Sequence, residues 1–462
     1  MNRRIEKKYL YRYVCALILT IIASGLFFAV WFNFVYTHNQ TGHLLGLGNL
    51  GMALGIYMLL YIFIGRSVRA FKIGVERKAS VIAAQIVALG IADVLEQFLS
   101  LAITGEFRFF WMFAWRYVLL LIVQCLVIGP LVVVMINIYR SKFPPLQLLE
   151  IYGDMDNDLY SSVNSIPYKY QIIERKHYSE GPFSQIFHLY DGVLINDIPA
   201  QKRNDILKEC FRQNKRVYFT PKLSDILVKS SDNLNLIDTP VFLLRNNGIS
   251  IVRLFIKRAF DICSSLAALI VLSPLFVIVA IAIKADDGGP VFYRQERCTI
   301  DRKRFMIIKF RSMIVDAEKD GKSHPAGEHD DRITKVGHVI RATRIDELPQ
   351  LINILKGDMS VVGPRPERVE HVNLYTDEIP EFAFRYKVKG GLTGYAKVYG
   401  KYNTTALDKL KMDLIYVTNF SLRLDFQIIV ETLKILFRKE STEGFSEDRA
   451  EEIHDKAMFE EE

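Results

Sequence analysis

Long apolar blocks are the feature that most limits how this chain can fold. Four of them fill the first third of the sequence, near Tyr11–Tyr36, Gly46–Gly65, Ala79–Ile103 and Ala114–Tyr139. Each has about the 20 residues that an α-helix needs to cross the ~30 Å hydrocarbon core of a bilayer. The sequence therefore predicts a membrane protein whose residues 1–143 form a bundle of four transmembrane helices.

Basic residues flank these blocks and predict how the bundle is oriented. The chain is 50% hydrophobic and carries a formal net charge of +8. One group of Lys and Arg precedes or opens the first block, a second lies between the second and third, and a third follows the fourth (Arg3, Arg4, Lys7, Lys8, Arg12; Arg66, Arg69, Lys72, Arg77, Lys78; Arg140, Lys142). The loop 38–43 has no Lys or Arg, and the loop near Glu106 has only Arg108. Positive residues stay cytoplasmic, so both ends of the bundle should face the cytosol. This distribution indicates a membrane partner and not nucleic acid.

Two acids interrupt the third block. Asp93 and Glu96 are costly in lipid, so we expect them to face the bundle interior or water. A transport role is one alternative, but it would need several buried charges along the four helices. Hydrogen bonding to Trp, Tyr or Arg partners such as Arg116 is the simpler interpretation.

A soluble segment, residues 144–248, follows the bundle. Strand-like runs alternate with polar helical runs (strands Leu148–Tyr152, Gly192–Ile198, Arg216–Thr220 and Val241–Leu244; helices Gln201–Asn214 and Leu223–Ser230). This alternation predicts a parallel α/β sheet of the Rossmann-like kind. A nucleotide-binding sheet would need a glycine-rich turn after its first strand. The turn here has one glycine, Gly153, and two aspartates, so a scaffolding or regulatory role is favoured over dinucleotide binding.

A fifth apolar run, Phe260–Ile283, is also long enough to span a bilayer. Basic residues flank it on both sides, which predicts that both flanks stay in the cytosol. Ser273 and Pro274 lie in its middle, and a proline inside a helix removes one hydrogen bond and bends the helix. We therefore expect a re-entrant, kinked helix over 255–284. The alternative is an ordinary fifth span that tolerates the proline.

The segment from Arg341 to Glu367 carries the candidate chemistry. Its apolar residues Leu348, Leu351, Ile352 and Leu355 predict a short helix that ends at Gly357. Asp346 lies where an N-cap belongs, so Asp346 and Glu347 should lie at a helix N-terminus that favours phosphate oxygens. Three arginines accompany the pair: Arg341, Arg344 and Arg365. Such a cluster suggests metal-assisted phosphate chemistry, although an ordinary cap beside a solvated acid fits the same residues.

Further basic and acidic side chains lie nearby in the sequence. Lys309 and Arg311 are two apart on a strand-like run and could clamp a diphosphate from one face. Glu328, Asp330 and Asp331 are candidates for additional metal ligands. Glycines at 390–394 would permit close backbone approach to a ligand. Residues 441–462 form an acidic tail.

Several motifs follow one another from about Arg253 to Phe437. They are Lys257-Arg258-Ala259-Phe260-Asp261-Ile262, Leu272-Ser273-Pro274-Leu275, Gly289-Pro290-Val291-Phe292-Tyr293-Arg294-Gln295, Lys309-Phe310-Arg311-Ser312-Met313, Asp331-Arg332-Ile333-Thr334, Asp346-Glu347-Leu348-Pro349-Gln350, Gly363-Pro364-Arg365-Pro366-Glu367 and Leu392-Thr393-Gly394-Tyr395-Ala396. In this order they resemble the motifs of the bacterial sugar transferases, the monotopic phosphoglycosyl transferases. The sequence departs from the family pattern at Ile345 and Gly390. It also departs at Lys397, where the family usually has Gln. Lys397 could alter a sugar or nucleotide contact.

The resemblance implies an enzyme of the bacterial inner membrane with cytoplasmic middle and catalytic domains. It implies a mainly α, monotopic catalytic domain over residues 249–440, with the kinked helix in the membrane. Asp346 would be the nucleophile that receives a sugar 1-phosphate from a UDP-sugar, and Glu347 would bind Mg²⁺. Undecaprenyl phosphate would be the acceptor, at the start of capsule, exopolysaccharide or O-antigen synthesis. A homodimer is compatible with the sequence. The alternative function is a non-catalytic membrane scaffold or regulator that keeps the same fold.

Overall fold

The computed structural model describes residues 3–36, 47–154, 157–244, 250–315, 317, 330–400 and 404–435. The loop 38–43, Glu328 and the acidic tail 441–462 lie outside these ranges. The chain divides into two compact units between Pro221 and Lys222. The first unit contains the apolar bundle and the parallel sheet, and the second contains the candidate chemistry.

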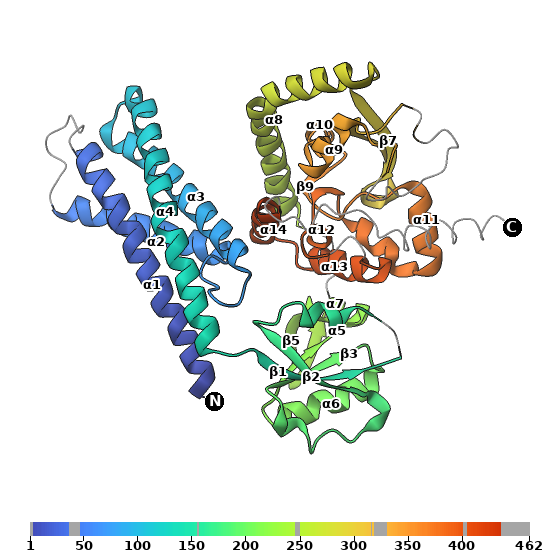
Figure 1. The fold of residues 1–462 in the computed structure, drawn as a ribbon. Coiled ribbons are helices and arrows are strands. Elements are labelled where there is room, and N and C mark those ends of the chain that lie inside the picture. Colours follow the sequence, from blue (N-terminus) through green and yellow to red (C-terminus); the bar gives the residue numbers. More distant parts are fainter. Residues whose placement is uncertain are drawn as a thin grey trace. The chain divides into compact units, whose positions relative to one another are not determined.

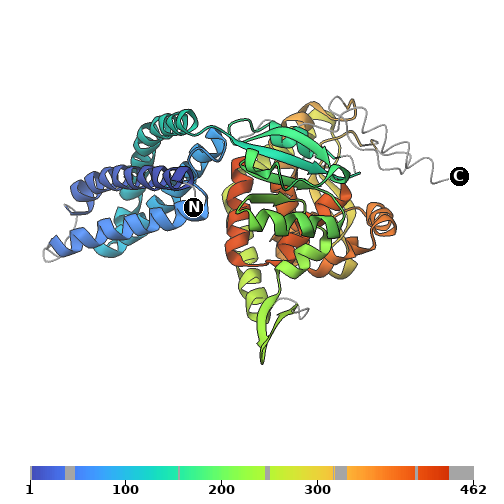
Figure 2. The same ribbon diagram turned by 90° about the horizontal axis from the view of Figure 1, so that it is seen from below.

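The four apolar blocks form helices that pack side by side, as Figures 1 and 2 show. They are α1 (Arg3–Trp31, followed by a π-helical turn at Phe32–Tyr36), α2 (Leu47–Ser67), α3 (Lys78–Thr104) and α4 (Phe110–Lys142). Three segments here are long and apolar enough to cross a membrane: Glu6–Trp31, Lys78–Ala102 and Phe107–Lys142. The apolar part of α2, Gly51–Ser67, is shorter.

The bundle interior contains polar side chains that bond to one another. Asp93 and Glu96 are 2% and 1% exposed, which confirms that they face inward. The Tyr57 hydroxyl donates to Asp93 over 3.1 Å and accepts a hydrogen bond from Gln124 over 2.8 Å. Asp93 therefore belongs to a tyrosine- and glutamine-containing network within the bundle, in line with the expectation from sequence. The buried Oε1 of Glu96 makes no hydrogen bond within the part of the chain that the structure describes.

The first unit also contains a four-stranded parallel sheet in the order β2-β1-β3-β4. Its strands are β1 (Leu146–Tyr152), β2 (Tyr170–His177), β3 (Gly192–Asn196) and β4 (Arg216–Phe219), with helices α5 (Leu159–Asn164) and α6 (Ala200–Arg212). The expected parallel α/β sheet is confirmed. The sequence did not predict β2, an edge strand rich in polar residues. The acidic turn after β1 contacts the neighbouring strand, because Oδ1 of Asp154 lies 3.0 Å from Nε2 of His177 in β2.

Two elements expected in the middle domain do not join this sheet. The segment near Val241 is a strand, β6 (Thr239–Leu243), but it pairs in an antiparallel hairpin with β5 (Asp232–Leu236). Helix α7 (Leu223–Lys229) packs within the second unit, where Ile226 forms a core with Phe382, Leu410 and Leu414. Assigning these two elements to the parallel sheet was therefore wrong. Local strand and helix patterns do not specify which core an element joins.

Helices predominate in the second unit. Its remaining elements are α8 (Ile251–Asp287), β7 (Phe292–Cys298), β8 (Arg304–Phe310), α9 (Lys335–Ala342), α10 (Gln350–Lys356), β9 (Ser360–Val362), α11 (Val369–Glu378), β10 (Gly391–Thr393), α12 (Tyr395–Tyr399), α13 (Ala406–Thr418) and α14 (Leu422–Ile435), with 3₁₀ segments at Ile300–Arg302, Ile345–Glu347 and Pro380–Lys387. β7 and β8 form an antiparallel pair, and β9 and β10 form a parallel pair. These two pairs hold the loops that reach the candidate site.

Helix α8 is bent, and the Ser-Pro pair explains how the bend is accommodated. Figure 1 shows its two halves running in different directions. Pro274 has no N–H for the carbonyl of Ile270 one turn earlier, and the Ser273 hydroxyl donates to that same carbonyl over 2.8 Å. Ser273 therefore supplies the hydrogen bond that Pro274 removes.

The start of α8 is fixed to the second unit by buried charges, although most of its apolar length is exposed. Lys257 lies 2.8 Å from Asp425 of α14, and the carboxylate of Asp261 accepts the N–H of Val361 in β9. Arg258 donates to the last carbonyls of α10, those of Ile354 and Leu355. In the most apolar 18-residue stretch of α8, only 11% is buried within the protein. The helix is long and apolar enough to cross a membrane.

The packing of α7 gives a test of the unit boundary. Ile226→Ala should lower the stability of the second unit by about 2–5 kcal/mol, because it opens a cavity beside Phe382 and Leu414. Val228→Ala on the same helix is the control, since Val228 is 54% exposed and the change should stay within about 0.5 kcal/mol. Pulse proteolysis of the full-length protein in urea, scoring fragments of the second unit, measures both. Equal effects of the two substitutions would show that α7 does not belong to this core.

Candidate active site

The backbone turns sharply just before the Asp-Glu pair. Arg344 has a φ of +56°, a left-handed conformation that is uncommon for a residue with a side chain. The chain then forms a single 3₁₀ turn, Ile345–Glu347, before α10 begins at Gln350. Pro349 stands at the N-cap position of α10 and makes no side-chain cap. Asp346 is thus not the N-cap that its position in the sequence predicted. The expected end at Gly357 is confirmed, with a φ of +97°.

The apolar stripe of this helix also differs from the expected one. Leu351 is buried as predicted, but Leu348, Ile352 and Leu355 are only partly buried. Ile354 is fully buried instead, and it packs with Leu351 in the core. The buried face is therefore set by packing against the core of Phe305, Ile307 and Met359, and not by the apolar stripe alone.

Glu347 is the centre of a cluster of cations. Its Oε2 accepts from Nζ of Lys397 at 2.5 Å, and its Oε1 accepts from a guanidinium N–H of Arg365 at 3.1 Å. Nζ of Lys309 lies 3.9 Å from Oε1. The Glu347 side chain is 10% exposed, so these charges act on it with little screening by water. One nearly buried carboxylate therefore orients three cations.

Asp346 and Glu347 differ in exposure and in proton affinity. Burial alone would raise the pKa of Glu347, but the charges of Lys397, Arg365 and Lys309 hold it well below the usual range. Burial and the neighbouring Glu347 carboxylate raise the pKa of Asp346, although the nearby cations oppose them. Asp346 is also the more accessible of the two. Neighbouring acids whose pKa values are pushed apart are suited to separate roles.

A close backbone contact places two of the three cations. β9 and β10 pair in parallel, with Gly391 opposite Ser360 and Thr393 opposite Val362. A Cβ on Gly391 would lie 2.1 Å from the backbone nitrogen of Gly363. A Cβ on Gly394 would lie 2.1 Å from the carbonyl oxygen of Gly363. The chain from Gly363 leads to Arg365, and Gly394 is the N-cap of α12, which carries Lys397. These glycines permit close approach of backbone to backbone, where the sequence had suggested approach to a ligand.

The position of the third cation, Lys309, depends on the contacts of Asn353. Buried Asn353 of α10 accepts the N–H of Ile308 and donates to the carbonyl of Met306, both in β8. This double contact fixes α10 against the strand that carries Lys309. Burial lowers the pKa of Lys309 to about 8, although the Glu347 charge opposes this.

The remaining predicted cations, three arginines, have other neighbours than Glu347. Arg311 does not join Lys309: it is 6% exposed, contacts Gly289 and pairs with Asp287 at the end of α8. Arg341 is close enough to Asp346 to lower its pKa. Arg344 acts in the same way on Lys397. The structure therefore brings together the Asp-Glu pair, Lys309 and Arg365, with Arg341 and Arg344 near them, and holds Arg311 in a separate ion pair.

Sequence reasoning missed the side chains that fix the Arg365 loop. Arg385, 2% exposed, donates to the carbonyl of Arg365 at 2.9 Å and pairs with Asp413 at 2.7 Å. Arg297 donates to the next carbonyl, that of Pro366. Arg297 lies two residues after the motif that ends at Gln295, which was a weak signal for it, but nothing local to Arg385 and Asp413 indicated their pairing.

The donor set fits a magnesium ion that is shared with a substrate. Mg²⁺ is usually held by one or two carboxylates, water and substrate phosphates, and not by an all-protein cage. Asp346 and Glu347 provide such carboxylates, and no group of three or more His, Cys, Asp or Glu able to hold a metal occurs in the described ranges. Asp330, a further candidate, pairs with Arg332 at 2.6 Å. Because Lys397 and Arg365 already bond both oxygens of Glu347, an ion there would compete with them.

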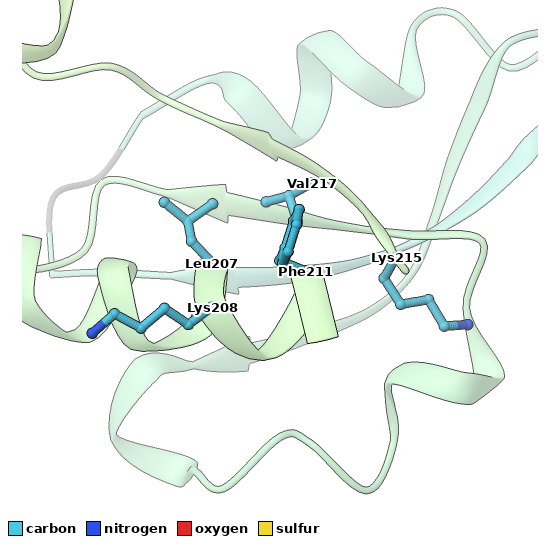
Figure 3. Close-up of a pocket in the computed structure, with 5 residues that line it drawn as sticks. All are labelled: Leu207, Lys208, Phe211, Lys215 and Val217. Atoms are coloured by element: carbon cyan, nitrogen blue, oxygen red, sulfur yellow. The ribbon is translucent and has the colours of Figure 1, made fainter. Parts of the chain in front are cut away.

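A shallow pocket lies elsewhere, in the first unit. Figure 3 shows its lining from α6, β4 and the turn between them: Leu207, Lys208, Phe211, Lys215 and Val217. No residue predicted for the site is among these five. The pocket has apolar side chains and two lysines but no acid or hydroxyl group, so it gives no support to catalysis there.

Comparison with known proteins places the second unit in a family. The family described as "Bacterial sugar transferase" matches residues 252–439, which include the whole Glu347 cluster. The "Exopolysaccharide production protein PSS" of Rhizobium leguminosarum bv. phaseoli is 42% identical over 188 residues, covering 39% of this chain and 94% of that protein. This chain belongs to the bacterial sugar transferase family.

Longer relatives of this sugar transferase are matched over part of their length. One is the UDP-N-acetylgalactosamine-undecaprenyl-phosphate N-acetylgalactosaminephosphotransferase of Aeromonas hydrophila, 42% identical over 54% of this chain and 59% of its own. Another is the UDP-glucose:undecaprenyl-phosphate glucose-1-phosphate transferase of Klebsiella pneumoniae, 33% identical over 64% of this chain and 60% of its own. This chain thus spans about three fifths of these two curated relatives.

The cation cluster predicts different stabilities for two adjacent, nearly isosteric changes. Glu347→Gln should destabilise the second unit by roughly 3 kcal/mol, because Lys397 then stays buried without its carboxylate. Asp346→Asn should change stability far less. Within the described ranges, Lys309, Arg365 and Lys397 form their ion pairs with Glu347 and not with Asp346. Pulse proteolysis in urea compares the two proteins. A greater loss in Asp346→Asn would show that the wrong carboxylate has been placed at the centre of the cluster.

Proposed function

We propose that this chain transfers a sugar 1-phosphate from a UDP-sugar to undecaprenyl phosphate. The observation that carries the proposal is an accessible carboxylate, Asp346, beside a nearly buried one, Glu347, that orients three cations. Cations placed in advance around a reacting phosphate stabilise the charge that develops there. The names of the Aeromonas and Klebsiella relatives support this reaction class.

In the first step, a carboxylate oxygen of Asp346 attacks the phosphorus that bears the sugar. The bond from that phosphorus to the bridging oxygen breaks, and UMP leaves with the oxygen and its electron pair. The aspartyl-phosphosugar that forms divides one transfer into two easier ones. The raised pKa of Asp346 makes it the more basic, and hence the more nucleophilic, of the two acids.

In the second step, a phosphate oxygen of undecaprenyl phosphate attacks the same phosphorus. The acyl phosphate bond breaks, Asp346 returns as a carboxylate, and the product is undecaprenyl diphosphate sugar. Arg365 and Lys309 are the side chains best placed to bind the phosphate groups, with Arg341 and Arg344 near them. Glu347 would hold Mg²⁺, which supplies charge neutralisation to the diphosphate when bound.

The membrane arrangement is part of the proposal. With basic flanks on both sides, α8 would enter the bilayer, bend at Ser273 and Pro274, and return to the cytosolic side. Both soluble domains would then be cytoplasmic, at the inner membrane, where UDP-sugars are available. The homodimer that the sequence left open is not included, because the relatives offer no support for it.

A non-catalytic scaffold or regulator remains the competing function. The intact Asp-Glu pair and its cations favour the enzyme, since a scaffold has no need of a carboxylate surrounded by largely buried lysines. The assay that decides uses purified protein, undecaprenyl phosphate and a panel of UDP-glucose, UDP-galactose and UDP-N-acetylated sugars, scored by UMP release. No release from any member of the panel would favour the scaffold.

Asp346→Asn should abolish turnover, because an amide cannot carry the sugar phosphate. Wild-type protein incubated with labelled UDP-sugar and no acceptor should retain label on Asp346, as mass spectrometry of its peptides would show. The variant should retain none and should release no UMP. Release of UMP by Asp346→Asn at near the wild-type rate would rule out Asp346 as the nucleophile.

The double change Ser273→Leu with Pro274→Leu should alter the membrane topology of α8. A straight helix gains roughly 3 kcal/mol over one interrupted by proline. Against this, each basic residue from Arg294 to Arg304 resists transfer to the bilayer centre by about 2.5–3.5 kcal/mol. The cost of one such residue is comparable to that gain, and the five basic residues between Arg294 and Arg304 together outweigh it. We therefore expect a mixed topology in which the re-entrant form predominates, with lower activity. Cysteine labelling at both flanks, from each side of sealed vesicles, measures this, and opposite-side labelling of wild-type flanks would exclude re-entry.

A further inference from the structure

Lys397 occupies the carboxylate that a divalent cation would use. Its Nζ donates to Oε2 of Glu347 at 2.5 Å and to the carbonyl of Leu392 at 3.0 Å. Its side chain is 14% exposed. This is the shortest of the three cation contacts to Glu347.

The three cations differ in how freely they could leave Glu347. Arg365 is held by its loop, whose carbonyls at 365 and 366 accept hydrogen bonds from Arg385 and Arg297. Lys309 lies 3.9 Å away, beyond hydrogen-bonding distance. Lys397 ends in a compact ammonium on a flexible four-carbon chain, and it can turn to a new acceptor without a change in the backbone.

We propose that Lys397 is an exchanging positioning residue: it closes Glu347 to metal in the nucleotide-free protein and moves to the diphosphate when nucleotide binds. This inference rests on the proposed function. An ammonium and a divalent cation repel each other and compete for the same carboxylate oxygens. A diphosphate supplies new acceptors for the ammonium, which frees Oε2. Metal and nucleotide would then bind cooperatively, and Lys397 would be the cause.

The test measures metal binding directly, with Mn²⁺ as the probe and free Mn²⁺ followed by electron paramagnetic resonance. Full-length protein is studied in nanodiscs, with and without UDP. Lys397→Gln should bind Mn²⁺ without UDP about tenfold to a hundredfold more tightly than wild type, the range over which neighbours of a metal ligand change affinity. UDP should strengthen Mn²⁺ binding in wild type and have little further effect in the variant.

Matched variants separate this role from a structural one. Lys397→Arg keeps the charge and should behave like wild type without UDP. Lys411→Gln removes a lysine from another ion pair of the same unit, with Asp408 at 3.1 Å, and should leave Mn²⁺ binding unchanged. Thermal unfolding confirms that each protein is folded, and if Lys397→Gln does not fold, Lys397→Met takes its place.

Equal, weaker or absent Mn²⁺ binding by the folded neutral variant would overturn the proposal. So would a wild-type protein whose Mn²⁺ affinity does not respond to UDP. These outcomes are distinct from failure of the proposed reaction, which UMP release by wild-type protein reports independently. Tighter Mn²⁺ binding with no UMP release would support the exchange at Lys397 and reject the transfer.

Discussion

The second unit depends on the charge of a single carboxylate that water hardly reaches. Glu347 contacts cations from three separate places in the chain: β8, the loop after β9, and α12. Without that negative charge, Lys309 and Lys397 would be largely buried cations with no carboxylate beside them, at a large free-energy cost. The same charge keeps Glu347 ionised, so the cluster is stable only as a whole. Asp346 lies beside it and remains available for chemistry.

The framework around the cluster is built from backbone contacts as much as from side chains. Gly391 and Gly394 let β10 and the start of α12 lie against Gly363, where a Cβ would collide. Buried Arg385 and partly buried Arg297 then donate to the carbonyls of Arg365 and Pro366. Asn353 likewise holds β8 in place by accepting the N–H of Ile308. Preorganised charge of this kind needs such support, because a small displacement of a cation weakens its action on a phosphate.

Much of this arrangement could be predicted from sequence, and the failures have a common cause. The apolar blocks, the inward-facing Asp93, the helix end at Gly357 and the alternating strands of the sheet follow from periodicity and local chemistry. Partners far apart in the chain do not: Lys397 meets Glu347 and Arg311 meets Asp287 only through tertiary folding. The polar edge strand β2 lacks the apolar pattern that identifies a strand. Asp346 has the side chain of a good cap, but the left-handed turn at Arg344 places it in a 3₁₀ turn instead.

The buried anchor of α8 has a consequence for distance. Lys257 and Asp261 tie this helix to α14 and to Val361 of β9, and β9 continues directly into the loop of Arg365. The apolar length of the helix is thus linked to the Asp-Glu pair through contacts within one unit. If a bilayer takes up the exposed apolar side chains of α8, the depth at which they lie also sets the height of Asp346 above the lipid surface. A lipid phosphate lies at a fixed height of its own, so in the proposed reaction the seating of α8 would set the distance between donor and acceptor.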